Sequence, residues 1–82
     1  MLKKSIYARD EKVIKFLAKK IKELRRENEM TQEELANEAE IGIAQLKRIE
    51  SGNINTSIST AYRISNALNV KIKDLFEDFE KK

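Results

Sequence analysis

The sequence predicts an all-α protein, and three features of its 82 residues indicate that fold class. The chain has no proline and only two glycines, so little in it interrupts a helix. Apolar residues make up 40% of it and charged residues 38%, which suits a small bundle of amphipathic helices. Apolar side chains also recur at steps of three and four, the spacing of one helix face. We therefore expect one compact helical domain.

The first helix is expected to follow residues 1–9, which have no clear period and are interpreted as an N-terminal arm. Asp10 is placed as its N-cap, and the helix ends near Asn28. Its core-facing stripe consists of Ile14, Leu17, Ile21 and Leu24. Val13 and Phe16 lie partly off this stripe, where they cover the arm, contact a second subunit or belong to the ordinary core.

Two short helices joined by a tight turn are predicted after the hydroxyl-bearing Thr31. The residues expected on their buried faces are Leu35, Ala36, Ala39, Leu46 and Ile49. Only residues 40–42 remain for the turn between them, a length typical of a DNA-binding helix-turn-helix. Ile41 is expected to fill the inside of this corner.

A fourth helix and a last apolar turn are predicted after the polar loop at residues 53–57, with Ser57 as N-cap. The residues expected on the buried face of this helix are Ile58, Ala61, Ile64, Ala67 and Leu68. Asn69 ends the helix. The last turn or short helix carries Val70, Ile72, Leu75 and Phe76, and Phe79 continues it.

The chain has no Cys and no His, and this excludes most catalytic and metal chemistry. Thiolate nucleophiles, disulfides, histidine bases and the usual zinc ligands are all missing. We therefore expect no enzymatic activity, no metal and no cofactor. No apolar run of about 18 residues and no signal core occurs. We expect neither a membrane span nor secretion, but a cytoplasmic, nucleoid-associated protein.

The net charge of +3 hides a strong segregation of charge along the chain. Bases outnumber acids in residues 1–30 and again in residues 47–73, whereas residues 31–46 carry acids only and residues 74–82 carry mostly acids. This sorting is compatible with a basic face turned toward phosphates. Charge alone favours the simpler interpretation, in which the lysine-rich helices are only soluble.

Four blocks of the sequence stand at the order and spacing of a known family. They are I-K-E-L-R at 21–25, M-T-Q-E-E-L-A at 30–36, I-E-S-G at 49–52 and I-S-N-A-L-N-V at 64–70. From Ile21 to Phe76 the chain resembles the Cro/phage-repressor type of helix-turn-helix proteins, the XRE family. The resemblance implies a compact five-helix, lambda-repressor-like DNA-binding domain, here residues 10–82. In it, helix two lies across the DNA backbone and helix three enters the major groove.

If Leu46 and Ile49 point into the core, the opposite face of helix three meets the bases. The base-contacting candidates on it are Ile43, Ala44, Lys47 and Arg48. Arg48 can donate two hydrogen bonds to guanine, and Lys47 can contact guanine or phosphate. Ile43 and Ala44 can pack on thymine methyls. The family usually has polar side chains at these two positions, and this departure argues against hydrogen-bonded readout there.

The resemblance also implies phosphate contacts and one structural ion pair. Gln32 matches the family's glutamine at the start of helix two, which holds a phosphate. Further phosphate-binding candidates are Ser51, Asn53, Asn55 and Ser57, for which capping or turn roles are the alternative. Arg25 and Glu50 match a salt bridge that ties helix one to helix three. Glu29 stands where the family often has glycine, and Asn28 is the better candidate for the helix-ending conformation.

We expect the partner to be double-stranded DNA with a pseudo-palindromic operator, bound by a homodimer. The apolar residues expected at the dimer interface are Ile72, Phe76 and Phe79. Such a chain fits a stand-alone repressor, a restriction-modification controller or an antitoxin with a toxin partner. A protein-interaction module on the same scaffold is the other alternative, which Ile43 and Ala44 favour and Lys47 and Arg48 oppose.

Overall fold

The computed structural model describes residues 10–80, and four α-helices and one short 3-10 helix make up its regular structure. The elements are α1 (Glu11–Glu27), α2 (Gln32–Ala39), α3 (Ile43–Glu50), α4 (Ile58–Ala67) and the 3-10 helix η1 (Ile72–Phe76). The all-α prediction is confirmed. The five-helix count is not confirmed, because the last element is a single 3-10 segment. The predicted arm at residues 1–9 lies outside the described residues.

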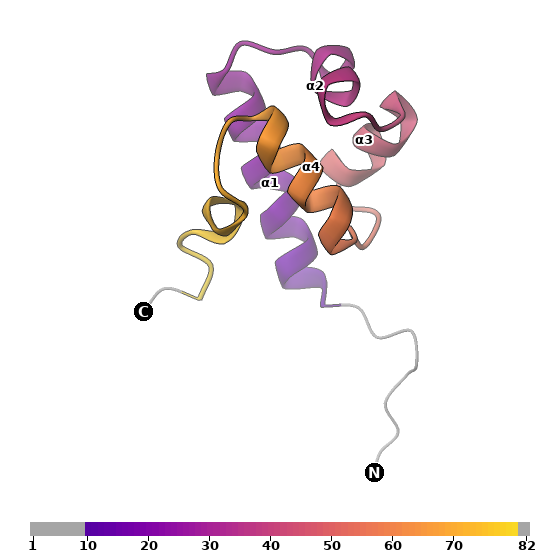
Figure 1. Ribbon diagram of the computed structural model, residues 1–82. Coiled ribbons are helices and arrows are strands. Elements are labelled where there is room, and N and C mark those ends of the chain that lie inside the picture. The colour runs from indigo at the N-terminus through magenta and orange to yellow at the C-terminus, as the bar shows by residue number, and fades with distance from the viewer. Residues whose placement is uncertain (1–9, 81–82) are drawn as a thin grey trace.

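The long helix α1 lies behind α4 in the view of Figure 1, with the α2–α3 pair toward the right and η1 toward the left. α1 contacts α3 on one side and η1 on the other, while α2 packs on both α3 and α4. α4 also contacts η1, which closes the bundle at the C-terminal end. This arrangement places the α2–α3 pair at one end of the molecule, away from η1 (Figure 1).

The core takes at least one fully buried side chain from every element. Those buried almost completely include Ile21, Leu35, Leu46, Ile64 and Leu75. The predicted stripe on α1 is confirmed at Ile14, Leu17 and Ile21, whereas Leu24 is only partly buried. The predicted burial of Ile58 is wrong, since its side chain is 74% exposed. Helical side chains point back toward the N-terminus, and Ile58 is the first residue of α4, so no earlier turn lies beneath it.

Every α-helix ends in the same hydrogen-bonded motif, in which one residue adopts a left-handed conformation. At the end of α1, the amides of Glu29 and Met30 donate to the carbonyl oxygens of Arg26 and Arg25, at 2.9 and 3.1 Å. The left-handed residues of the four helices are Glu29, Glu40, Gly52 and Asn69, with φ of 57°, 59°, 76° and 62°. The residues that follow three of them pack against the core: Met30, Ile41 and Val70.

The residue that ends α1 is not the one that the sequence favoured. Asn28 keeps an ordinary φ of −86°, and Glu29 adopts the left-handed conformation instead. The Asn28 side-chain amide donates to the carbonyl oxygen of Leu24 at 2.8 Å, a bond that suits its helical position. Shifting the left-handed residue by one position would turn Met30 away from the core. Burial of Met30 therefore outweighs the better intrinsic tolerance of Asn28.

Two of the three predicted N-cap side chains make their bonds. Thr31 Oγ1 accepts from the Glu34 amide at 3.0 Å, and Glu34 Oε1 accepts from the Thr31 amide at 2.8 Å, a reciprocal capping box. Ser57 Oγ accepts from the Thr60 amide at 3.1 Å. Asp10 occupies the N-cap position of α1, but its side chain makes no capping bond.

None of the helices within residues 10–80 is long and apolar enough to cross a membrane.

Candidate nucleic-acid interface

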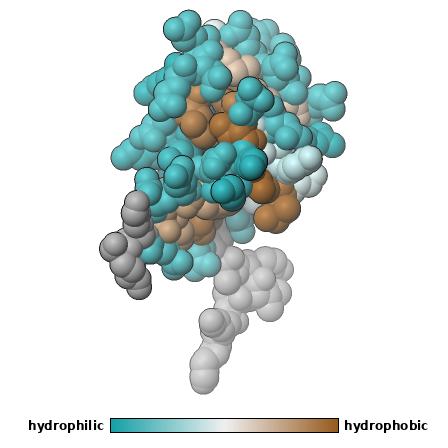
Figure 2. All heavy atoms as spheres, turned by 60° about the vertical axis from the view of Figure 1, so that its left-hand side comes forward, coloured by the Kyte–Doolittle hydropathy of each residue, from teal (hydrophilic) through white to brown (hydrophobic). Residues whose placement is uncertain are grey.

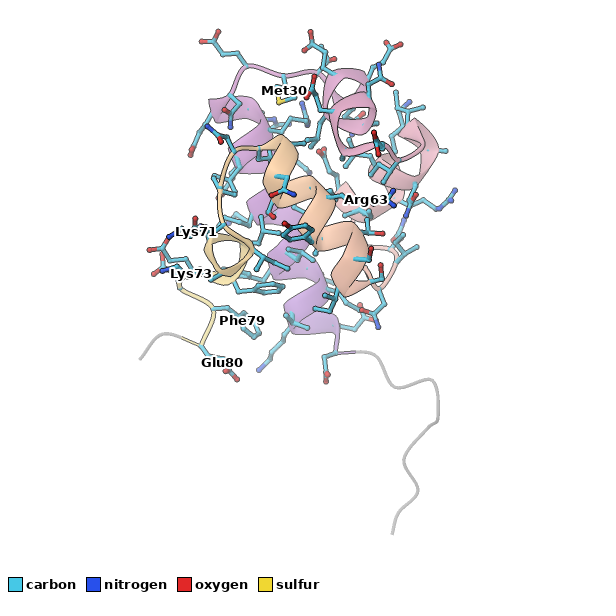
Figure 3. The ribbon with its side chains drawn as sticks, in the orientation of Figure 1. Met30, Arg63, Lys71, Lys73, Phe79 and Glu80 are labelled. Carbon is cyan, nitrogen blue, oxygen red and sulfur yellow. The ribbon has the colours of Figure 1, made fainter. Side chains whose placement is uncertain are left out.

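The turn between α2 and α3 is made by residues 40–42, as the spacing predicts. Glu40 makes the bend with its left-handed backbone, and Ile41 turns inward against the core. Gly42 is extended, with φ −72° and open space where a Cβ would lie, so the turn does not require glycine there. Arg63 of α4 braces the corner, since its Nη1 donates to the Glu40 carbonyl oxygen at 3.3 Å (Figure 3).

Helix α3 has one buried and one open face. Leu46 and Ile49 are 0% and 2% exposed, so they fix the helix to the core. The four base-contacting candidates, which are Ile43, Ala44, Lys47 and Arg48, all lie exposed. Ile43 is 41% exposed, a large apolar side chain on the same face as the two cations. The open face therefore offers two cationic donors together with two apolar contacts.

Arg25 and Glu50 form a bidentate ion pair between α1 and the end of α3. Arg25 Nε donates to Glu50 Oε2 at 2.8 Å, and Nη2 donates to Oε1 at 3.0 Å. The side chains are only 12% and 2% exposed. Arg25 Nη1 donates to the Met30 carbonyl oxygen at 2.9 Å, so the pair also ties down the α1–α2 connection. This geometry leaves neither charge available to a base.

Gln32 lies at the first residue of α2 and is held by the same ion pair. Its Nε2 donates to Glu50 Oε1 at 3.1 Å, and the side chain is half-buried. The amide is thus held in one orientation, and a side chain held in this way loses less entropy when it binds a ligand. The backbone amides of the first turn of α2 lie beside it.

The other phosphate-binding candidates are spread around the α3–α4 loop. Ser51 Oγ donates to the Arg48 carbonyl oxygen at 2.8 Å, and Ser57 caps α4, so both hydroxyls also have structural roles. Asn53 and Asn55 are exposed. Asn55 faces a different side of the molecule, since it lines a depression with Val13 and Phe76. The structure therefore brings Gln32 and Ser51 together but separates Asn55 from them.

Sequence reasoning missed two cations that the fold brings beside Gln32. Lys22 and Arg26 of α1 line one open depression of about 310 Å³ together with Gln32, Lys47 and Ser51. Their spacing of four residues on one helix was visible in the sequence. The sequence does not show that these two side chains lie beside the N-terminus of α2. Their position depends on the packing of α1 against α3, which is a tertiary contact.

The apolar residues expected at a dimer interface are all partly covered within the chain. Ile72 and Phe76 pack against the core, and the Phe79 ring (labelled in Figure 3) has its centroid 5.1 Å from that of the Phe16 ring. The most exposed large apolar side chains of the described residues are instead on α4, where Ile58 is 74% and Tyr62 55% exposed. On the face that Figure 2 shows, apolar surface interrupts the hydrophilic surface in patches.

Comparisons with known proteins agree on one family. Residues 21–75 match a family model described as helix-turn-helix. Two uncharacterized HTH-type transcriptional regulators of Archaeoglobus fulgidus are 40% and 39% identical over 57 residues. These matches cover 70% of this chain and 80% and 81% of the two relatives.

Solved structures with the same fold include two restriction-modification controller proteins. C.AhdI from Aeromonas hydrophila is 26% identical with a TM-score of 0.74, over 79% of this chain and 97% of that one. Wild-type C.Esp1396I is also 26% identical with a TM-score of 0.74, over 85% of this chain and 95% of that one.

Proposed function

Since this chain belongs to the helix-turn-helix family of transcriptional regulators, we propose that it binds a specific, pseudo-palindromic operator in double-stranded DNA as a homodimer. Residues 10–82 act as one DNA-binding domain, with α3 in the major groove and the start of α2 on the backbone. The protein works without a cofactor and without an enzymatic step. It acts as a small repressor or as a controller of restriction-modification genes, a role that its likeness to C.AhdI and C.Esp1396I supports.

The observation that carries this proposal is the division of α3 into two faces. Leu46 and Ile49 are buried in the core, so Lys47 and Arg48 project from a helix whose orientation is set by its packing. A fixed helix with exposed guanidinium and ammonium groups satisfies the geometric need of direct readout, in which donors meet guanine O6 and N7. The ion pair of Arg25 with Glu50 keeps the opposite end of the helix in place.

Selection of binding sites from random duplex DNA tests the proposal. We expect an inverted repeat and an affinity for it at least about a thousand-fold above that for a scrambled duplex. The Arg48→Ala variant should lose about 1–3 kcal/mol of operator binding and relax the preference at one base position in each half-site. Lys73→Ala, which removes an exposed charge from η1, is the matched control and should retain both.

A protein-interaction module or an antitoxin is the second candidate, because Ile43 is a large apolar group on the open face of α3. Weak binding to every duplex that disappears with rising salt, and no enriched sequence, would support it against the operator proposal. A pull-down from the native cell with wild-type protein and with Ile43→Asp would then identify whether that face holds a protein partner.

We assign the contact between the two subunits to the parts of Ile72, Phe76 and Phe79 that remain exposed in the single chain. We expect Phe79→Ala to raise the dimer dissociation constant by roughly ten-fold, since a central aromatic contact is worth at least about 1–2 kcal/mol. Sedimentation equilibrium over a range of concentrations measures this. Tyr62→Ala, on the exposed face of α4, should leave the constant unchanged. The reverse pattern would move the interface to α4.

A further inference from the structure

We propose that the DNA-binding surface extends onto α1, where Lys22 and Arg26 contact phosphates of the strand that passes beside the recognition helix. The inference rests on the proposed function and adds to it a second basic surface outside the helix-turn-helix. It deepens that function by assigning two contacts with the DNA backbone to α1, a helix outside the α2–α3 pair.

The geometry of the depression points to this contact. Lys22 and Arg26 lie four residues apart, so they share one face of α1 about 6 Å apart along its axis. Both line the open depression that also contains Gln32 at the start of α2 and Lys47 of α3. Three helices therefore direct polar side chains into one concave surface.

The charges inside the depression do not cancel. Glu50 is the only carboxylate in its lining, and both of its oxygens accept from Arg25, with Gln32 donating to one of them. Arg25 and Glu50 thus neutralise each other. Among residues 10–80, no ion pair or hydrogen bond involves the side chain of Lys22, Arg26 or Lys47. Lys22, Arg26 and Lys47 therefore line one depression whose single carboxylate is already paired with Arg25, and such an excess of positive charge attracts phosphate.

The position of Lys47 indicates that the occupant is a DNA strand rather than a free anion. Lys47 lies on the open face of α3 and in the depression at the same time. The depression is therefore continuous with the proposed base-contacting surface. A strand whose bases meet α3 must leave the groove past this point, and Gln32 already marks the start of α2 as a phosphate contact. The depression is also open rather than enclosed, which suits an extended backbone.

Salt dependence of operator binding measures the contact directly. Each phosphate contact contributes about one unit to the slope of log affinity against log salt concentration. We expect Lys22→Gln/Arg26→Gln to reduce the slope by about two units while the ratio of specific to non-specific affinity stays the same. The matched control is Lys12→Gln/Lys20→Gln, which removes the same charge from the same helix. Lys12 and Lys20 face the C-terminal segment, beside Glu80 and Asp78 respectively.

The outcomes separate this inference from the proposed function. Wild-type protein that selects no operator overturns the function first and this contact with it. If wild type binds its operator but the Lys22/Arg26 double variant keeps the wild-type slope, only the α1 contact is wrong. Equal losses in both double variants would show a general effect of net charge and would also overturn it. The exchange Lys22→Arg/Arg26→Lys keeps both cations and should therefore keep the wild-type slope of log affinity against log salt concentration. Circular dichroism should show that all variants are folded.

Discussion

Replacing Arg25 with methionine is expected to lower the free energy of unfolding by about 3–5 kcal/mol, because it leaves the Glu50 carboxylate buried without its cation. Glu50 is only 2% exposed, so water cannot replace the two hydrogen bonds at 2.8 and 3.0 Å. Gln32 would remain its one side-chain donor. A protein of 82 residues has a total stability of roughly 4–12 kcal/mol, so this loss is a large fraction of it. Urea denaturation measures the change.

A second variant separates two effects: the cost of leaving the Glu50 carboxylate buried without a cation, and the loss of its attraction to Arg25. In Arg25→Met/Glu50→Met both charges are replaced by apolar groups of similar size, and we expect it to be more stable than Arg25→Met alone. A single variant within about 1 kcal/mol of wild type would show that Glu50 is solvated after all. The pair would then have no structural role in holding α3, and the fixed orientation of Gln32 would need another cause.

Structural features that depend only on residues close together in the chain could be predicted from the sequence. The stripe on α1 and the buried faces of α2 and α3 follow from helical periodicity, which is a property of each segment alone. The three-residue turn at 40–42 and the Thr31 cap are likewise local. Within the candidate site, the open face of α3 could be predicted in the same way, because the burial of Leu46 and Ile49 determines which residues face outward.

Features that depend on packing between distant segments could not be predicted. Glu29 adopts the left-handed conformation because Met30 must reach the core, a requirement set by the other helices. The Phe79 ring meets Phe16 across 63 positions of the chain, and neither residue's own spacing indicates this contact. The depression that brings Lys22 and Arg26 beside Gln32 likewise arises only from the way α1 packs on α3. The intrinsic preferences of single residues decide little at such positions.

Truncating Leu46 to alanine is the second change with a large expected effect, about 2–5 kcal/mol of unfolding free energy. Leu46 is 0% exposed at the centre of the core, and removing its side chain leaves a cavity that the short helix α3 can close only by shifting. Thermal or urea denaturation measures the loss. An effect below about 1 kcal/mol would mean that this side chain does not hold α3, and that burial of Leu46 does not fix the outward face of the helix.

The opposite face of the same helix provides the control. Ile43→Ala removes an apolar group that is 41% exposed and introduces the residue with the best helix propensity, so its unfolding free energy should change by less than about 1 kcal/mol. Its operator preference should nevertheless change, because the proposed contact with a thymine methyl is lost. Folded Leu46→Ala protein should keep the wild-type preference. Stability and recognition would then be assigned to opposite faces of one eight-residue helix.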